Sequence, residues 1–366
     1  MPIDTRILIL VPGNETKGGI TNYYSIMHNK FTLSVDYFYR GSRKWPYRSS
    51  KFNEFRRLCS DYYSYYKLVR SRKYRLVQTT TSFSPLALLR DAIFIIIAKW
   101  FKLKVIVFYH GGDDTTVHII ERKYFRLFKS IYFNKVDGII DLSKSNIKRW
   151  EQWGYQKLVH LETTTVDDKL IKDINVDFLI DKYRNENKDI HILFLSRIEV
   201  TKGIYETIDA FKRISINFPN VYLDIAGIGT ALENVKKYIE DNKIERIKLL
   251  GFVDKAQKTE TYKYADIYIL PSYFEGMPTT VIEAMAFGIP IITRNVGGLP
   301  DFFVNGVHGY ITDSKSPDVF ADFINVMLNN KSLMADIAIN NFNYAQQHFL
   351  LSKVVKRVEA IFNDVI

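Results

Sequence analysis

The chain has 366 residues, of which 47% are hydrophobic, and its formal net charge is +11. This length and composition are enough for two ordinary α/β domains and exclude a single small core. The one cysteine, Cys59, excludes an internal disulfide and a cysteine-based metal cluster, and it is compatible with a reducing compartment.

The N-terminal residues predict no secretory signal, because residues 6–11 already form a short apolar strand. The most apolar later stretch, residues 92–98, is followed by three lysines and is far shorter than the roughly 20 residues that span a bilayer. We therefore expect a cytoplasmic protein, and a peripheral position on the inner face of the plasma membrane remains open.

Short β-branched runs alternate with helical stretches, which is the pattern of parallel sheets with helical crossovers. Six strands are predicted in the first half, at residues 6–11, 34–39, 76–79, 104–109, 138–141 and 158–161. Six more are predicted in the second half, at residues 191–195, 221–226, 247–250, 267–270, 289–293 and 309–311.

The charged, turn-poor stretch at residues 167–188 looks like a helical linker between these two series of strands. It predicts two Rossmann-like, doubly wound α/β domains, residues 1–172 and 173–349, with the last helix at about 350–366 packing back on the first. If the two domains face one another, the carboxyl ends of both sheets meet at a shared cleft, where ligands bind in open α/β sheets.

The charge is unevenly distributed between the two halves. Residues 1–172 hold 30 Lys and Arg against 15 Asp and Glu, whereas residues 173–366 hold 21 against 25. Residues 37–75 alone hold 12 basic, 2 acidic and 12 aromatic side chains. This composition suits an anionic membrane surface, and a solvated basic helix with core-facing aromatics is nearly as plausible. Nucleic acid is the weakest interpretation, because no RNA-binding signature accompanies the patch.

Two features of the first half follow predicted strands. Gly18 and Gly19 come after the first strand and open a helix. His110 ends the apolar fourth strand and precedes two glycines, a position that favours a functional role over the structural role usual for a lone histidine. The adjacent carboxylates Asp113 and Asp114 could bind Mg²⁺, but no further carboxylate lies nearby in the sequence, so we predict no metal site.

In the second half, motifs again follow the strands. Arg197 and Lys202, five residues apart, can clamp a diphosphate, although such a pair is a weak signal alone. Gly227 allows close backbone approach, and a plain turn explains it equally well. Phe252 and Val253 could offer a ring and backbone groups to a nucleobase.

The run from Tyr273 to Ala286 is the most informative segment. It places Glu275 on a Gly/Pro loop and Glu283 about two turns into a helix, whose free N–H groups gather between the two carboxylates. Such N–H groups bind phosphate, and carboxylates accept hydrogen bonds from hydroxyls, so the run predicts a nucleotide-sugar site. The predicted donor-binding residues of this loop and helix are Glu275, Gly276, Met277, Pro278, Thr279 and Glu283.

Together these residues resemble the donor-binding domain of the retaining glycosyltransferases of family 4 (glycosyl transferases group 1), which have the GT-B fold. The resemblance covers residues 190–313. It rests on Ser196-Arg197, Lys202-Gly203, Ala226-Gly227-Ile228-Gly229, Gly251-Phe252-Val253, Pro271-Ser272, Glu275-Gly276-Met277-Pro278, Glu283-Ala284-Met285-Ala286-Phe287-Gly288-Ile289-Pro290 and Gly297-Gly298.

The resemblance implies a role for each matching residue. Arg197 and Lys202 would hold the diphosphate, Glu283 would bind the ribose hydroxyls, and Glu275 would contact the transferred sugar. In the looser resemblance of the first half, the Gly18-Gly19 pair would lie near the donor phosphates and the acceptor, and His110 near the reacting carbon of the sugar. The family needs no cofactor and generally no catalytic metal.

We therefore expect a retaining, metal-independent hexosyltransferase. It would move a hexose or N-acetylhexosamine from a nucleotide sugar, with UDP favoured, to a lipid-linked or growing glycan acceptor in cell-surface polysaccharide assembly. The alternatives are a nucleotide-sugar epimerase of the same fold and a non-catalytic membrane- or glycan-binding module. Two loops depart from the family pattern, at residues 78–85 and 163–167, and they leave the acceptor open.

Overall fold

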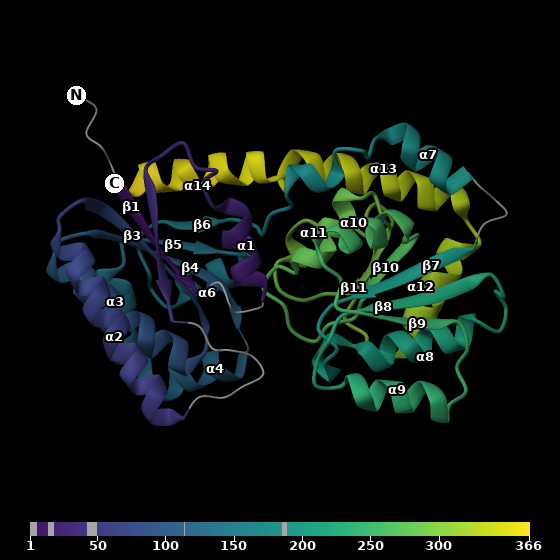
Figure 1. Ribbon diagram of the computed structural model, residues 1–366, viewed down its shortest axis with the longest axis horizontal. Helices are drawn as coiled ribbons and strands as arrows, with labels where there is room; N and C mark the ends of the chain where they lie inside the picture. The colour runs from purple at the N-terminus through teal and green to yellow at the C-terminus, as the bar shows by residue number, and fades with distance from the viewer. Residues whose placement is uncertain (1–5, 14–17, 42–49, 113, 185–188) are drawn as a thin grey trace. The chain divides into compact units, whose positions relative to one another are not determined.

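The computed structural model describes residues 6–13, 18–41, 50–112, 114–184 and 189–366 and divides the chain into two compact units (Figure 1). The first unit comprises Met1–Thr164 and Leu351–Ile366, and the second comprises Thr165–Leu350. The predicted boundary at residue 172 is therefore too late. The second unit begins at Thr165 because Thr165 Oγ1 and the Val166 N–H both donate to the Phe349 carbonyl, at 3.1 and 2.9 Å.

The first unit is built on a parallel six-stranded sheet in the order β2-β1-β3-β4-β5-β6. All six strands predicted for this half are confirmed. Their bounds are β1 Arg6–Pro12, β2 Val35–Arg40, β3 Tyr74–Phe83, β4 Lys104–Gly112, β5 Gly138–Asp141 and β6 Val159–Leu161. The chain moves outward from β1 to β2 and then returns past β1 to β3, so the strand order reverses between β1 and β3.

Two strands of this sheet run further than the sequence predicts. Residues 80–83, which lie beyond the predicted strand at 76–79, continue β3, and His110 lies inside β4 instead of following it. Two polar side chains of β3 have a partner in the core, because the Tyr24 hydroxyl accepts hydrogen bonds from Gln78 Nε2 and Thr80 Oγ1. Burial with a hydrogen-bond partner, which the local sequence does not reveal, turns the expected loop into strand.

Helices cover both faces of the first sheet. Helix α1 lies beside α14, and α2 lies beside α3, on opposite sides of the sheet (Figure 1). Their bounds are α1 Gly19–Met27, α2 Lys51–Arg70, α3 Pro85–Trp100, α4 Asp114–Ile119, α5 Phe125–Phe128, α6 Lys144–Gln152 and α14 Leu351–Val365, with two π-helical segments, η1 Ile120–Tyr124 and η2 Lys129–Phe133. Glu359 anchors α14 to this unit, because it accepts hydrogen bonds from Thr32 Oγ1 at 2.9 Å and from the Leu33 N–H at 3.0 Å.

The second unit holds another parallel six-stranded sheet, in the order β12-β11-β10-β7-β8-β9. The bounds are β7 Ile190–Leu195, β8 Val221–Ala226, β9 Ile247–Gly251, β10 Ile267–Leu270, β11 Ile291–Arg294 and β12 Gly309–Thr312, which confirm the six strands predicted for this half. The chain fills the sheet from β7 outward to β9 and then from β10 outward to β12. The order therefore reverses between β7 and β10, and ligands bind beyond the carboxyl ends of the strands at such a reversal.

Short helical segments and longer helices cover this second sheet. They are η3 Asp168–Ile171, α7 Val176–Arg184, η4 Val200–Lys202, α8 Ile204–Ile214, α9 Leu232–Asp241, α10 Lys255–Tyr264, α11 Thr279–Ala286, η5 Leu299–Asp301, α12 Pro317–Leu328 and α13 Lys331–His348. All six residues of α11 from Val281 to Ala286 are buried.

The aromatic side chains of the basic region at residues 37–75 are partly buried and partly exposed. Residues 42–49, with Trp45 and Tyr47, lie outside the described residues. In α2, Tyr65 is buried in the core, as the solvated-helix interpretation expects, whereas Phe52, Phe55 and Tyr63 are exposed. No helix within the described ranges has both the length and the apolar composition to cross a membrane.

Candidate functional site

The candidate residues of the second unit come from the carboxyl ends of four adjacent strands. Arg197 and Lys202 follow β7, Gly227 follows β8, Phe252 follows β9, and Glu275 follows β10. Strands β10 and β7 flank the point where the strand order reverses. The sheet topology thus gathers, at one edge, residues that are up to 78 positions apart in the chain.

Lys202 and Glu275 form an ion pair at this edge. Lys202 Nζ lies 2.6 Å from Glu275 Oε1 and 3.4 Å from the Phe274 carbonyl oxygen. The two side chains are only 13% and 14% exposed, so each is held in a fixed place. An ammonium has three donors, and a carboxylate has about four lone-pair positions. The pair can therefore contact a phosphate and a hydroxyl without separating.

Arg197 is placed differently from the expectation that it pairs with Lys202 in one clamp. Its side chain is 65% exposed, and Nη1 lies 2.8 Å from Glu199 Oε1. The structure thus brings Lys202 together with Glu275, while Arg197 pairs with a carboxylate two residues later. A long exposed guanidinium of this kind can turn toward an anion, and its role on the diphosphate stays a prediction.

Glu283 is fully buried, and it is held by two residues that the sequence reasoning missed. Lys258 Nζ lies 2.6 Å from Glu283 Oε1, and the Tyr262 hydroxyl donates to Glu283 Oε2 at 2.9 Å. Burial, with the neighbouring carboxylate, raises the pKa of Tyr262 well above its ordinary value, so the hydroxyl keeps its proton and remains a donor. Glu283 thus has partners within the unit for both of its oxygens, and its role on the ribose hydroxyls stays a prediction.

Helix α11 begins at Thr279 without a side-chain cap, after the N-cap residue Pro278. Its first N–H groups have no partner within the helix and carry the positive end of the helix dipole, which favours an anion there. Gly276, Met277 and Pro278 form the loop between Glu275 and this helix, as the sequence predicts. The loop places an ion-paired carboxylate directly beside uncapped backbone donors.

Two glycines fix the backbone of these loops. A Cβ at Gly297 would lie 2.1 Å from the Gly276 oxygen, and the residue has a φ of 61°. The Gly298 N–H donates to the same oxygen at 2.7 Å, so residues 297–298 brace the Glu275 loop from outside. A Cβ at Gly227 would lie 1.8 Å from the Ser196 oxygen. Close packing between loops therefore explains Gly227, and its contact with a donor stays a prediction.

Residues 252 and 253 lie at the outer end of this edge. The Phe252 ring is 55% exposed, and Val253 is half-buried. Gly251 precedes them with a φ of 67°, and a Cβ there would meet no atom within 4 Å. An exposed ring beside open backbone can stack on a flat aromatic ligand, in line with the predicted nucleobase contact.

In the first unit, Gly18 and Gly19 begin α1, and His110 lies near the end of β4. A Cβ at either glycine would meet no atom within 4 Å, so packing within the unit does not require a glycine at these positions. The His110 ring packs edge-on against Tyr23 of α1, with centroids 5.5 Å apart. The structure thus brings the start of α1 and the end of β4 to one edge of the sheet.

His110 is held as a neutral imidazole. Burial, together with the positive charge of Arg40, lowers its pKa from 6.5 to about 3. Its Nε2 atom is buried and has no hydrogen-bond partner among the described residues. The Nε2 atom of a neutral imidazole can donate a hydrogen bond to a ligand hydroxyl or accept one from it, depending on the tautomer, and the uncharged ring brings no positive charge to the site.

No group of three or more His, Cys, Asp and Glu residues gathers as a metal site in the described part of the chain. Asp113 lies outside the described residues, and the side chain of Asp114 is not described either. The predicted independence of a metal therefore stays a prediction.

Solved structures with the same arrangement of strands and helices cover nearly the whole chain. HepE of Anabaena, solved in complex with UDP and glucose, matches with a TM-score of 0.73 at 18% identity, over 98% of this chain and 99% of that one. At this identity the likeness shows the fold alone. That fold is GT-B, as the sequence predicts.

The family comparison covers the second unit. Residues 175–344 match the model of the family described as glycosyl transferases group 1. An uncharacterized glycosyltransferase of Methanocaldococcus jannaschii is 25% identical over 173 residues, 47% of this chain and 48% of the relative. The capsular polysaccharide biosynthesis glycosyltransferase CapM of Staphylococcus aureus is 26% identical over 205 residues, 56% of this chain and 50% of the relative. The chain thus matches about half the length of these curated relatives.

Proposed function

We propose that this protein is a retaining glycosyltransferase that uses a nucleotide sugar, with a UDP-sugar as the favoured donor. The observation that carries the proposal is the Lys202–Glu275 ion pair beside the uncapped start of α11, with Glu283 buried four residues into that helix. It combines a fixed cation, backbone donors and carboxylate acceptors at the point where the strand order reverses. A diphosphate and sugar hydroxyls are the groups that such a set recognises.

The chemistry assigned to these residues follows from where charge develops. When the bond between the sugar and the diphosphate breaks, negative charge accumulates on the leaving diphosphate. Lys202 and the N–H groups of α11 would stabilise that charge, while Glu275 would hold hydroxyls of the transferred sugar. No described residue stands out as a covalent nucleophile. The leaving diphosphate would therefore take the proton of the attacking hydroxyl, and the new bond would form on the same face of the sugar.

For the acceptor, we propose a lipid-linked or growing glycan of a cell-surface polysaccharide, with a hexose or N-acetylhexosamine as the transferred sugar. Support comes from the similarity to CapM, whose name places it in capsular polysaccharide biosynthesis. The reaction would need no cofactor or metal.

A ligand panel tests the donor. We expect UDP to raise the melting temperature of the full chain more than GDP does, because the nucleotide that binds more tightly stabilises the folded chain more. A ligand at one hundred times its Kd adds about 2.7 kcal/mol of stability. If neither nucleotide shifts the melting temperature at millimolar concentration, the proposal is wrong.

A second measurement tests the reaction itself. With a UDP-sugar and a glycan acceptor, NMR of the product should show the anomeric configuration of the donor, and inversion would contradict the proposed retention. Conversion of the donor to another UDP-sugar without any acceptor would identify an epimerase instead.

A further inference from the structure

Helix α3 carries an apolar stripe on its outward side. Its inward residues, among them Phe94 and Ile95, belong to the core, whereas five large apolar side chains at heptad-like spacing are between 37% and 76% exposed. These five residues are Leu86, Leu89, Ile93, Ile96 and Trp100. A surface helix normally presents polar residues on its outer side, so a helix that is apolar on both sides lacks a covering partner among the described residues.

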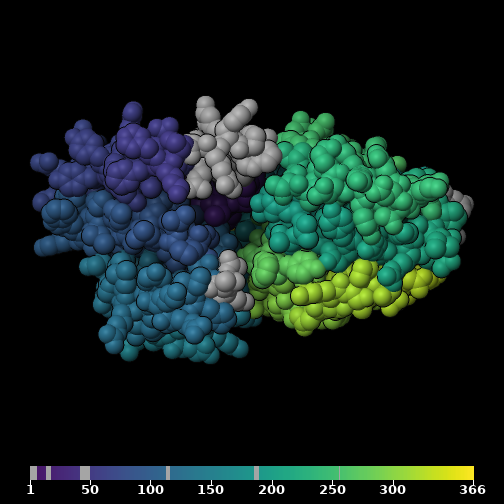
Figure 2. All heavy atoms as spheres, turned by 90° about the horizontal axis from the view of Figure 1, so that it is seen from below, coloured from purple at the N-terminus to yellow at the C-terminus, as the bar shows by residue number. Residues whose placement is uncertain are grey.

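Helix α2 extends this apolar surface. The two helices pack side by side, with Tyr62 and Phe94 ring centroids 4.8 Å apart. The exposed side chains Phe52, Phe55 and Tyr63 of α2 add to the five residues of α3, and we call these eight residues the α2–α3 face. Residues coloured purple through blue, which include both helices, lie beside one another in the space-filling view (Figure 2).

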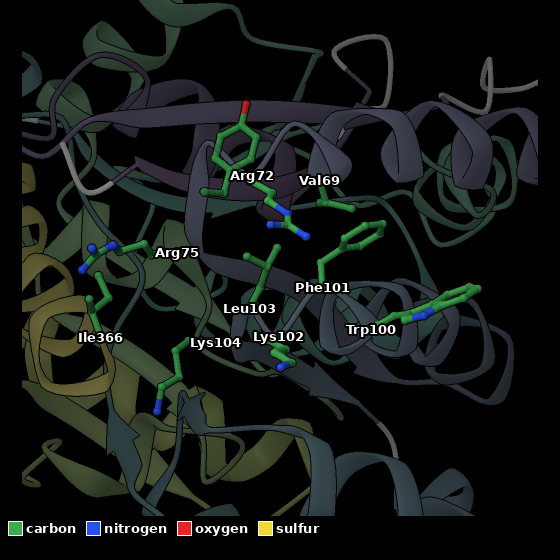
Figure 3. Close-up of a pocket in the computed structure, with 10 residues that line it drawn as sticks. Val69, Arg72, Arg75, Trp100, Phe101, Lys102, Leu103, Lys104 and Ile366 are labelled. Carbon is green, nitrogen blue, oxygen red and sulfur yellow. The ribbon is translucent and has the colours of Figure 1, made fainter. Parts of the chain in front are cut away.

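The stripe leads into a basic pocket. Trp100, its last residue, lines a pocket of about 520 Å³ together with Phe101 and four exposed cations, Arg72, Arg75, Lys102 and Lys104 (Figure 3). None of the described residues that line this pocket has an acidic side chain. Lys104 Nζ also lies 3.9 Å from Asp137 Oδ1, outside the lining. Aromatic and aliphatic walls with a ring of cations suit a phosphate attached to an apolar group.

The pocket lies away from the candidate functional site. Arg72 and Lys102 follow the ends of α2 and α3, immediately before β3 and β4 begin. The pocket is therefore at the amino ends of these strands, whereas His110 lies near the carboxyl end of β4. Since the strands are parallel, these are opposite edges of the sheet. The proposed sugar chemistry does not account for the pocket.

We propose that the α2–α3 face docks on an anionic lipid bilayer, with the apolar stripe in the interface and lipid phosphates at the four cations. Trp100 sits where an interfacial tryptophan is favoured, between the apolar stripe and the charges. A second copy of this chain fits less well, because its equally basic surface would meet the same cations. The proposal shifts the predicted membrane contact from residues 37–75 alone to a surface centred on α3, and it does not depend on the proposed transfer reaction.

Co-sedimentation of the full chain with vesicles tests the proposal. We expect binding to phosphatidylglycerol vesicles and at least tenfold weaker binding to phosphatidylcholine vesicles. Binding to the phosphatidylglycerol vesicles should weaken as the salt concentration rises. The double variant Ile93→Asn/Ile96→Asn should lose at least tenfold in vesicle affinity. Ile216→Asn is the matched control, because Ile216 is an exposed isoleucine of the second unit, and it should bind as wild type does.

The pocket can be tested with variants that are not expected to unfold the protein. Arg72 and Lys102 take left-handed backbone conformations, with φ of 55° and 60°, which glycine adopts more readily. Arg72→Gly/Lys102→Gly therefore removes two cations while easing the backbone, and affinity for anionic vesicles should fall about 25-fold, at roughly fivefold per cation. Lys243→Gly is the control, since Lys243 follows the end of α9 with a similar left-handed conformation, and it should not change vesicle affinity.

Fluorescence gives an independent readout of contact. Brominated lipids should quench tryptophan emission of the wild type when it binds, and most of this quenching should vanish in Trp100→Phe. The proposal is overturned if the wild type ignores anionic vesicles, or if the stripe and pocket variants bind like their controls. It is also overturned if the Ile93→Asn/Ile96→Asn change only converts a dimer to a monomer, which would assign the face to a second copy. UDP should stabilise every variant equally, so failure here is distinguishable from failure of the proposed transfer.

Discussion

The two units share a parallel six-stranded sheet, but they hold their candidate residues in opposite ways. In the second unit, the charged residues Lys202, Glu275 and Glu283 are paired within the unit. The loop that carries Glu275 is braced by Gly297, which lies too close to the Gly276 oxygen to accept a side chain. The charged side chains Lys202, Glu275 and Glu283 at this edge of the second sheet therefore have their partners within the unit.

The first unit leaves its corresponding edge open. A Cβ at Gly18 or Gly19 would meet nothing within 4 Å, and His110 Nε2 has no hydrogen-bond partner among the described residues. The described residues of the unit do not explain these features, so we infer that contacts from a ligand account for them. The comparison predicts that substitutions at the candidate residues of the second unit will lower stability and activity together. Substitutions at those of the first unit should lower activity and leave stability unchanged.

The largest effect is expected from Lys202→Ala. The change removes the cation that is held beside the start of α11, and it leaves the Glu275 carboxylate without its partner in a site that is mostly shielded from water. Loss of one such preorganised group typically costs about 100- to 1000-fold in rate. Transfer from a UDP-sugar should fall by this factor. Lys237→Ala, an exposed lysine of the same unit, should be silent, and an unchanged rate in Lys202→Ala would refute the assigned role.

The next effect concerns the buried ion pair of Lys258 and Glu283. Lys258→Met leaves a fully buried carboxylate without its cation, which costs about 3 kcal/mol in stability. The melting transition that UDP stabilises should shift down by several degrees. The double variant Lys258→Met/Glu283→Gln should recover part of that loss, because the uncompensated charge is gone. If the stability losses of the single variants Lys258→Met and Glu283→Gln add up to the loss of the double variant, the two residues do not act as a pair.

The glycines give the most direct comparison between the units. Gly297→Ala places a Cβ against the Gly276 oxygen at a left-handed φ, and it should destabilise the second unit by about 2 kcal/mol. Gly18→Ala should leave stability within about 0.5 kcal/mol, because its φ of 165° is extended backbone and its surroundings are open.

Activity then separates the explanations for Gly18. If a ligand approaches this backbone closely, Gly18→Ala should lower transfer while thermal stability stays unchanged. An equal loss of stability in the two alanine variants would show that the first unit is packed as tightly as the second.

The sequence predicts all twelve strands because strands buried on both faces of a parallel sheet read as short apolar, β-branched runs. It ends β3 too early, at residue 79, and does not reveal that Thr80 hydrogen-bonds to the Tyr24 hydroxyl, more than fifty residues away in the chain. The Glu275 and Glu283 positions are recognisable from local spacing. Lys258 is not, because it lies 25 residues before Glu283 on a lysine-rich helix and its contact depends on how α10 packs against α11.

The same limit applies to the α2–α3 face. From the sequence, residues 92–98 are recognisable only as a strongly apolar stretch, and composition cannot show that one side of the helix they belong to lies outside the core. Only the packing of α3 against the sheet distinguishes Phe94, which is buried, from Ile93 and Ile96, which are exposed.

The smallest expected effect is a pH dependence that comes from His110 of the first unit. In the folded protein the pKa of His110 is lowered to about 3, whereas an unfolded histidine titrates near 6.5. Below pH 6.5 the unfolded chain therefore binds a proton that the native state does not, and stability falls as pH falls toward 3. His110→Gln should remove this loss, on the order of 1 kcal/mol between pH 6.5 and about pH 5.

Asp141 supplies a control of opposite sign in the same unit. Burial raises its pKa from 3.8 to about 6, against the hydrogen bonds that Trp150 and Asn146 donate to it. The native state therefore keeps a proton that the unfolded state releases, and this contribution to stability is lost as pH rises from about 4 to 6. Asp141→Asn should steepen the acid-side loss that His110→Gln flattens. Parallel pH profiles of melting temperature for both variants and the wild type would mean that neither group is held as described, and that the open edge of the first unit lacks a neutral imidazole.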